Sequence, residues 1–335
     1  MKVDGGVGFE LDTVGAQAQE LEEMGYSGIM TAETSHDPFF PLLVAAQNTS
    51  RVDLVTSIAV AFARTPMILA NIGHDLNAAS HGRFVLGLGS QIRAHITKRF
   101  SMPWSHPADR MREFILAMRA IWANWHHGEP LEFVGKYYTH SLMTPFFTPT
   151  NNEFGAPRVF LAAVGPRMTE VAGEVADGVI IHAFSTEKYI RETTLPALQR
   201  GFAKAGKTGK DFEISYPSFV VTGKNEQELA EAKVATRRQI AFYGSTPAYK
   251  PVLESIGVGE LQGDLNVMSK QGRWEEMGHL ITDDILNAFA VVGEPQDIAG
   301  QMLSRYGDIV DRTSAAYAHI AKQDRQEIIA QLTAA

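Results

Sequence analysis

The stretch GRFVLGLGSQ, residues 82–91, is the point from which the rest of this chain can be interpreted. Its first half is aromatic, β-branched or large and apolar, which is typical of a buried strand over residues 83–87. Two glycines then stand on alternate positions, where a backbone can turn sharply or approach a ligand closely. The residues that could contact a ligand here are Gly87, Gly89, Ser90 and Gln91. A plain tight turn is the structural alternative.

Apolar strands and amphipathic helices alternate along the rest of the chain. Strands are expected at residues 3–9, 26–31, 53–61, 83–87, 159–163, 178–182, 212–222 and 308–318. Strict alternation implies a parallel sheet, and eight such units predict an α/β fold of the closed (β/α)8 type, a TIM barrel. The rival is an open doubly wound sheet, which would need a GxGxxG turn after its first strand. Glu10-Leu11 follows that strand instead, so the barrel is favoured.

The chain has 335 residues, more than the roughly 250 of a typical barrel. We therefore expect a single TIM-barrel domain over residues 1–335, with two insertions near the barrel mouth at approximately 126–157 and 243–282. The first is rich in proline and aromatic residues, and the second is rich in glycine. Aromatic insertions can cover an apolar pocket or form dimer contacts, and both interpretations stay open.

The composition excludes several classes of function. A formal net charge of −8 argues against a nucleic-acid partner, because duplex binding usually needs a basic face. No window approaches about 18 uninterrupted apolar residues, so no membrane partner or span is expected. The first residues lack the apolar core of a signal peptide, and the absence of cysteine excludes disulfides. We expect a cytoplasmic protein.

Charged and polar residues follow most of the expected strands. They are Glu33 and His36 after the second strand, Arg64 after the third, Gly87 to Gln91 after the fourth, Gly165 to Arg167 after the fifth and His182 after the sixth. A barrel brings the carboxyl ends of its strands together, and its chemistry takes place there. The pattern predicts a cofactor cleft at the barrel mouth.

Each of these residues also has a structural interpretation. His36 could exchange a proton near neutral pH, or it could cap the helix that follows. Glu33 could act in the reaction or pair with an arginine. Gly165 opens a helix whose free N–H groups could hold a phosphate together with Arg167, or it could form a plain turn.

Two histidine patterns are less informative. His95 and Arg99 are four residues apart, so a helix would place both on one face, where they could meet an anion or stay solvated. His126 and His127 are adjacent, and the chain has no HExxH motif or facial triad, so no metal site is predicted.

Four segments taken in order resemble the luciferase-like monooxygenase superfamily of TIM barrels. They are EEMGYSGIMTAE, SIAVAFARTP, SHGRFVLGLGSQ and AAVGPRMTEVAGEVADG. The resemblance covers nearly the whole chain, and the GRFxLGLG strand and the AGxxADG segment are its most specific parts. The segments SQIRAHITKRF and YGST look closest to the branch that uses the deazaflavin coenzyme F420 in place of FMN.

This resemblance implies a flavin or deazaflavin at the carboxyl end of the barrel. The end of the third strand would back the ring, often through a non-prolyl cis peptide bond, for which Ser57–Ile58 and Ala59–Val60 both fit. The end of the fourth strand and the start of the helix after the fifth would hold the ribityl chain and phosphate. The cofactor-binding residues implied are Ala59, Val60, Ala61, Arg64, Gly87, Gly89, Ser90, Gln91, Ala163, Val164, Gly165, Pro166 and Arg167.

One departure from the family pattern affects the acid–base assignment. Many F420-dependent relatives carry Asp-His directly at the end of the second strand, whereas Glu33-Thr34 stands there in this chain and His36 comes two residues later. Imidazole has the better intrinsic pKa for work near pH 7. We therefore predict that His36 is the proton donor and that Glu33 maintains the geometry or charge of the site.

Three functions are compatible with these observations. The first is an F420-dependent oxidoreductase that transfers a hydride to or from a small organic substrate. The alternative is an FMNH2-dependent luciferase-like monooxygenase, and the third is a non-catalytic F420-binding paralogue. A homodimer or higher homo-oligomer is expected in each case.

Overall fold

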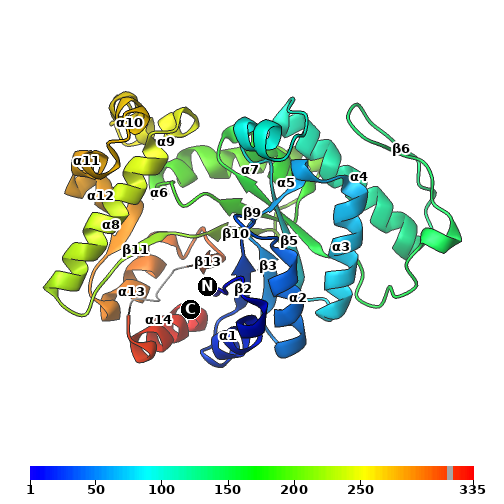
Figure 1. The fold of residues 1–335 in the computed structure, drawn as a ribbon, viewed down its shortest axis with the longest axis horizontal. Coiled ribbons are helices and arrows are strands. Elements are labelled where there is room, and N and C mark those ends of the chain that lie inside the picture. Colours follow the sequence, from blue (N-terminus) through cyan, green and yellow to red (C-terminus); the bar gives the residue numbers. More distant parts are fainter. Residues whose placement is uncertain (315–319) are drawn as a thin grey trace. The chain divides into compact units, whose positions relative to one another are not determined.

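The computed structural model describes residues 1–314 and 320–335, and it is the predicted α/β barrel with eight parallel strands in a closed sheet. Figure 1 shows the strands and the helices that follow them. The barrel strands are β1 (Lys2–Gly6), β2 (Gly28–Thr31), β3 (Asp53–Thr56), β5 (Phe84–Gly89), β8 (Arg158–Ala163), β9 (Gly178–Ile181), β10 (Glu213–Tyr216) and β13 (Arg312–Ser314). All eight overlap the predicted strands, and β1, β5 and β8 extend one or two residues beyond the predicted bounds. Part of the predicted strand 308–318 lies outside the described residues.

The chain divides into two compact units. The N-terminal unit comprises Gly5–Ile180 and Ala197–Glu213, and the C-terminal unit comprises Met1–Asp4, Ile181–Pro196 and Ile214–Ala335.

Four neighbouring barrel strands form the sheet of the N-terminal unit. β2 pairs with β3, β3 with β5 and β5 with β8, all in parallel. Every residue of β5 is buried, which explains its continuous apolar sequence. Since the pairing is parallel, the segments that follow these four strands leave the sheet at one end. Glu33, Gly87 and Gly165 therefore lie toward the same end, as predicted.

Helices follow the strands of this unit. They are α1 (Leu11–Glu23), α2 (Phe39–Asn48), α3 (Pro66–Ala79), α4 (Pro107–His127), α5 (Pro166–Val175) and α7 (Leu195–Ala205). The predicted apolar stripe of α4 is buried in full, and its residues are Met111, Phe114, Ile115, Met118, Ile121, Trp122 and Trp125. The indole N–H of Trp122 donates to the carbonyl of Ala70 in α3 at 3.1 Å, so this tryptophan is a core residue.

Residues 128–157 form an extended arm rather than a compact lid. The arm contains the two-stranded hairpin of β6 (Phe133–Val134) and β7 (Thr139–His140). The carboxylate of Glu113 on α4 accepts three successive backbone N–H groups from residues 136–138 and fixes the hairpin. Phe146 and Phe147, which follow the hairpin, are 89% and 68% exposed. These aromatic residues do not line an enclosed pocket.

The C-terminal unit contains the other part of the barrel and a small second sheet. β13 pairs in parallel with β1 and with β10. β11 (Phe219–Val221) pairs in parallel with β12 (Ala290–Val292), a strand that the sequence did not reveal. The predicted strand 212–222 is divided between β10 and β11 because Pro217, which has no N–H to donate, follows β10.

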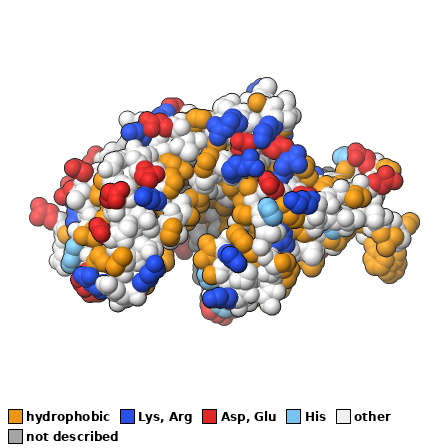
Figure 2. All heavy atoms as spheres, turned by 90° about the horizontal axis from the view of Figure 1, so that it is seen from above, with side chains coloured by type: hydrophobic (Ala, Val, Ile, Leu, Met, Phe, Trp, Pro, Cys, Tyr) orange, Lys and Arg blue, Asp and Glu red, His pale blue; other side chains and the backbone are white. Residues whose placement is uncertain are grey.

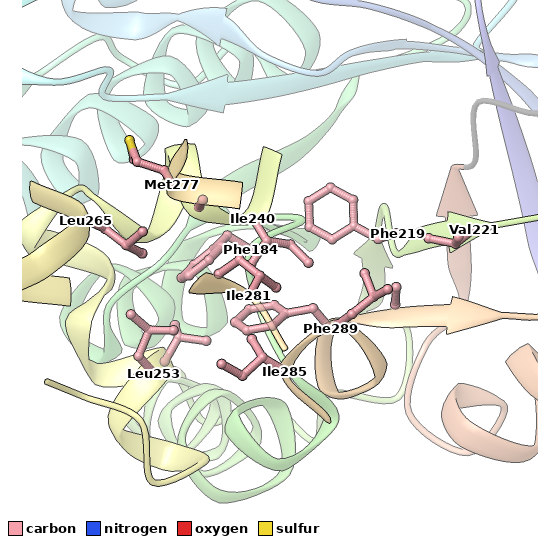
Figure 3. Packing of buried hydrophobic residues seen from close by; sticks show 14 of the residues in the cluster. Phe184, Phe219, Val221, Ile240, Leu253, Leu265, Met277, Ile281, Ile285 and Phe289 are labelled. Carbon is pink, nitrogen blue, oxygen red and sulfur yellow. The ribbon is translucent and has the colours of Figure 1, made fainter. Parts of the chain in front are cut away.

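The second insertion is helical and has its own core. After α8 (Glu226–Gly244) come α9 (Lys250–Ser255), α10 (Leu261–Lys270), α11 (Trp274–Met277) and α12 (Asp283–Phe289), and the chain ends with α13 (Pro295–Tyr306) and α14 (Lys322–Ala334). Figure 3 shows the cluster that α8 to α12 build with β11 and the segment after β9. Its labelled members are Phe184, Phe219, Val221, Ile240, Leu253, Leu265, Met277, Ile281, Ile285 and Phe289.

None of the helices in the described part of the chain is long and apolar enough to cross a membrane. Among the same residues, no group of three or more histidine, aspartate or glutamate side chains is arranged to hold a metal ion.

Candidate functional site

An arginine joins two carboxylates at the carboxyl end of the N-terminal sheet. Arg64 lies 2.7 Å (Nη1) from the Oε2 atom of Glu33 and 3.0 Å (Nη2) from the Oδ2 atom of Asp37. The same oxygen of Glu33 accepts the N–H of Val60 at 2.7 Å. The Glu33 side chain is 6% exposed and that of Arg64 16%, so both charges are largely withdrawn from water. Glu33 thus pairs with an arginine, and its geometry suits positioning better than proton transfer.

The third barrel strand is interrupted beside this ion pair. β3 ends at Thr56, the Ser57–Ile58 peptide bond is cis, and the short strand β4 (Ala59–Val60) then pairs with the end of β5. The carbonyl of Ile58 accepts the N–H of Glu33 at 3.1 Å, and the N–H of Ser57 donates to Thr31. The sequence left two positions open for a cis bond, and the structure has it at the first.

This interruption changes which residues could face a ligand. Ala59, Val60 and Ala61, which the family resemblance implied would back the ring, are completely buried. Ser57 and Ile58 are partly exposed. The accessible part of the interruption is therefore the cis peptide segment itself, two residues before the predicted position.

The two glycines of β5 lie directly against neighbouring residues, and neither faces an open space. A Cβ atom on Gly87 would lie 1.8 Å from the carbonyl oxygen of Thr56, and one on Gly89 would lie 2.7 Å from Cδ1 of Ile58. The hydroxyl of Thr56 also donates to the carbonyl of Gly87 at 2.8 Å. The missing side chains let β5 approach the interrupted strand closely. Both positions are therefore closed to a side chain, and contact of Gly87 and Gly89 with a cofactor stays a prediction.

Ser90 and Gln91 form the turn that leaves β5. Gln91 has a left-handed backbone with φ of 58°, and its side-chain oxygen accepts the N–H of Ile92 at 3.0 Å. The hydroxyl of Ser90 donates to the carbonyl of Gln91 at 3.1 Å. Both polar side chains are used within the turn and are half-buried.

The side chain of His36 is exposed and has no hydrogen bond to any described residue. Its ring stacks on Phe9 at a centroid distance of 5.0 Å and an interplanar angle of 27°, and it makes no hydrogen bond within the described residues. The start of α2 is stabilised instead by Asp37, whose Oδ1 accepts the N–H of Phe39 at 2.9 Å. His36 therefore does not cap the helix, and its imidazole is accessible to a bound molecule or to water.

The start of α5 presents unsatisfied backbone donors. Gly165 precedes the helix and Pro166 occupies its first position, so the next N–H groups have no intrahelical partner. A Cβ atom on Gly165 would meet nothing within 4 Å. Arg167 is 71% exposed and lies 3.1 Å from the Oδ1 atom of Asp109. Ala163 is buried and Val164 is half-buried, so these two residues are less accessible to a ligand than Arg167.

Further cations follow β5 in the same unit. Residues His95–Arg99 form a π-helical turn, and Arg99 donates to the carbonyl of Thr34 and lies over the ring of Phe100. Arg99 thus ties this turn to the loop after β2, a link that the four-residue spacing from His95 did not predict. Arg93 and Lys98 are exposed, and Figure 2 shows Lys and Arg side chains gathered on the face seen there.

Sequence reasoning missed two parts of the region. Asp37 completes the arginine network, although only its position beside His36 could have indicated this. The second part is Arg110, which is buried with its guanidinium carbon 4.4 Å from the ring centre of Phe62 and which donates to Tyr138 at 2.7 Å. An arginine in an apolar helix stripe was the available signal.

Comparison with known proteins identifies the group to which this chain belongs. Residues 2–312 match the family described as luciferase-like monooxygenase. An uncharacterized protein of Mycobacterium tuberculosis is 54% identical over 93% of this chain and 92% of its own. The F420-dependent glucose-6-phosphate dehydrogenase of Beutenbergia cavernae is 29% identical over 72% and 68%.

A solved structure agrees on the fold. The coenzyme F420-dependent tetrahydromethanopterin reductase of Methanopyrus kandleri superimposes with a TM-score of 0.79 over 99% of this chain and 97% of that one, at 20% sequence identity. The family match runs from the first residue of β1 to the first residue of β13 and includes every residue of the candidate site. This chain therefore belongs to the luciferase-like monooxygenase family of oxidoreductases.

Proposed function

We propose that this protein is an F420-dependent oxidoreductase that transfers a hydride to or from a small organic substrate. The family uses flavin or F420, and the glucose-6-phosphate dehydrogenase that is 29% identical is named for F420. The observation in this chain that supports F420 over FMN is the set of exposed cations that follow β5 and β8, namely Arg93, Lys98 and Arg167. FMN carries one phosphate, whereas F420 carries a phosphodiester and a tail of carboxylates.

The donor set fits such an anionic group. The free N–H groups after Gly165 would hold a phosphate, because a helix N-terminus attracts anions. Arg167 would add a charge at the same place once it turns from Asp109. The exposed side chains of Arg93 and Lys98 offer charges for carboxylates. The cis segment at Ser57 and Ile58 would support the ring.

Bound F420 supplies the carbon that accepts or donates the hydride. The chain supplies the rest. Arg64 forms ion pairs with both Glu33 and Asp37 and so holds the loops after β2 and β4 in one arrangement. His36, exposed and without an intramolecular hydrogen bond, would give a proton to the substrate oxygen or take one from it.

The test is a comparison of cofactor affinities. F420 and FMN are titrated into the full chain, and binding is followed by the fluorescence of each cofactor. We expect F420 to bind more tightly and FMN to compete weakly. Tighter binding of FMN together with oxygen consumption would support the monooxygenase instead. F420 binding without turnover across a panel of alcohols and ketones would support the non-catalytic paralogue.

Variants at the start of α5 sharpen this test. Arg167→Ala should weaken F420 binding by about 1–3 kcal/mol, an effect that salt should reduce. Asp109→Asn removes the carboxylate that competes for Arg167 and should tighten binding. Arg112→Ala is the control, because Arg112 pairs with Glu174 near the other end of α5. Equal affinities for all three variants at low salt would show that the turn is only structural.

A further inference from the structure

His182 directly follows β9 and lies among aromatic side chains of the C-terminal unit. Its ring stacks on Tyr249 at a centroid distance of 4.9 Å and meets Tyr243 edge-on at 4.7 Å. Tyr243 belongs to α8, and Tyr249 precedes α9. Three segments that are distant in sequence thus place one imidazole and two phenols together, after a barrel strand.

The hydrogen bonding of His182 defines its chemical state. Nδ1 accepts the backbone N–H of Phe184 at 3.0 Å, so the ring proton of the neutral imidazole is on Nε2. Burial lowers the pKa of His182 to about 4, and the ring is therefore neutral at pH 7. Nε2 makes no hydrogen bond to any described residue. The result is one oriented N–H donor without an intramolecular acceptor.

The rings of the two tyrosines pack against the core, whereas their hydroxyls have no hydrogen-bond partner among the described residues. Both rings pack against the core cluster of Figure 3, where Phe184 lies 5.3 Å from Tyr249 and 4.5 Å from Phe289. Neither phenol hydroxyl forms a hydrogen bond within the described residues. Both residues are only partly buried, so water or a ligand can reach these hydroxyls. Rigid aromatic walls with a few polar groups are characteristic of small-molecule sites.

We propose that His182, Tyr243 and Tyr249 form a substrate-binding site that holds the carbonyl or hydroxyl oxygen of an uncharged, largely apolar molecule. The Nε2–H of His182 donates to that oxygen, and the tyrosine rings contact the apolar body. A neutral imidazole offers no charge to a carboxylate or phosphate, which favours an uncharged ligand. The substrate role rests on the proposed oxidoreductase function, whereas the binding itself does not.

The test measures binding to the full chain without cofactor. Cyclohexanone, cyclohexanol and acetophenone serve as neutral probes, and cyclohexanecarboxylate serves as the charged control. The imidazole signals are followed by NMR, and the His182 signal is assigned by its loss in His182→Phe. We expect saturable shifts of this signal with at least one neutral probe and none with the carboxylate. The same shifts without F420 binding would retain this site and reject the proposed function.

Two variants separate binding from packing. His182→Phe keeps an aromatic ring and removes the donor, and Tyr249→Phe removes only a hydroxyl. His182→Phe should weaken binding of the neutral probe by about fivefold or more, as expected for one lost hydrogen bond. Tyr249→Phe keeps the ring that contacts the apolar body and should leave the affinity similar. His279→Gln, on an exposed segment of the same unit, should leave affinity unchanged. No saturable shift with any neutral probe, wild-type affinity of His182→Phe for the neutral probe, or tighter binding of the carboxylate would overturn the proposal.

Discussion

Arg64 is the residue on which the geometry of the candidate site depends. It reaches Glu33 and Asp37 on the loop after β2 from the segment after β4. Removing one partner of a largely buried ion pair leaves a charge without compensation. Arg64→Met should therefore lower the free energy of unfolding by about 2–4 kcal/mol. Urea unfolding followed by circular dichroism measures this change.

Arg112→Met provides the comparison for Arg64. Its ion pair with Glu174 is 2.7 Å long but its side chain is 46% exposed, so water screens the interaction. Its loss should cost less than about 1 kcal/mol. If both variants lose the same stability, the ion pair of Glu33 contributes no more than a surface pair, and our interpretation of it as a positioning element is wrong.

His36 allows a change in rate to be separated from a change in stability. Its side chain is exposed and its described contact is the stack on Phe9, so His36→Ala should hardly change the thermal midpoint. If it is the proton donor, turnover should fall by about 10²–10⁴-fold while F420 affinity stays similar. Turnover and thermal unfolding are measured on the same sample. A variant that loses stability but keeps its rate would assign His36 a structural role.

At the scale of elements, the close approach of β5 to β3 requires glycine at position 87. Gly87→Ala would place a methyl group 1.8 Å from the Thr56 carbonyl, so the two strands would have to separate. We expect a loss of about 3 kcal/mol or more, or failure to fold. Gly165→Ala is the matched control, since its methyl group meets nothing within 4 Å. Thermal unfolding of both variants checks this, and equal midpoints would contradict the close approach.

The elements also show what could be predicted from the sequence. The apolar runs and intervening helices indicated the barrel strands, most clearly β5 and β9, which are buried at every position and carry no charged residue. The helices of residues 250–289 were missed because they are short and separated by glycines, such as Gly257 and Gly272 with positive φ. β12 was missed because it has three residues, which are too few to show the apolar run or the alternation that indicates a strand. These elements depend on the core cluster of Figure 3 more than on local preference.

The sequence indicated which residues lie at the end of the sheet, but it did not indicate which of their side chains contact one another. Strand order places residues at one end of the sheet, which is why Glu33, Arg64 and Gly165 could be named together. Which carboxylate meets Arg64, and that Gly89 faces Ile58, depend on the interruption at Ser57–Ile58. A side-chain contact of this kind follows from tertiary packing, which the spacing of residues along the chain does not report.

At the scale of the whole molecule, neutral histidines make stability depend on pH. Burial lowers the pKa of His126, His140 and His182, the last from 6.5 to about 4. As the pH falls below about 6.5, these side chains take up protons in the unfolded chain before they do so in the folded one. Stability contributed by the neutral state is therefore complete above about pH 7.5 and is lost progressively toward about pH 4.

Thermal unfolding from about pH 8 to about pH 4.5 tests this dependence. The midpoint should be level at the alkaline end and should fall as the pH drops through the range where free histidine titrates. His182→Phe cannot take up this proton in either state, so its midpoint should fall less steeply, whatever its value at pH 8. His279→Gln, on an exposed segment, should keep the wild-type slope. If His182→Phe shows the same slope as the wild type, His182 is protonated equally in the folded and unfolded chains. Its Nδ1 would then carry a proton at acidic pH and could not accept the N–H of Phe184 there.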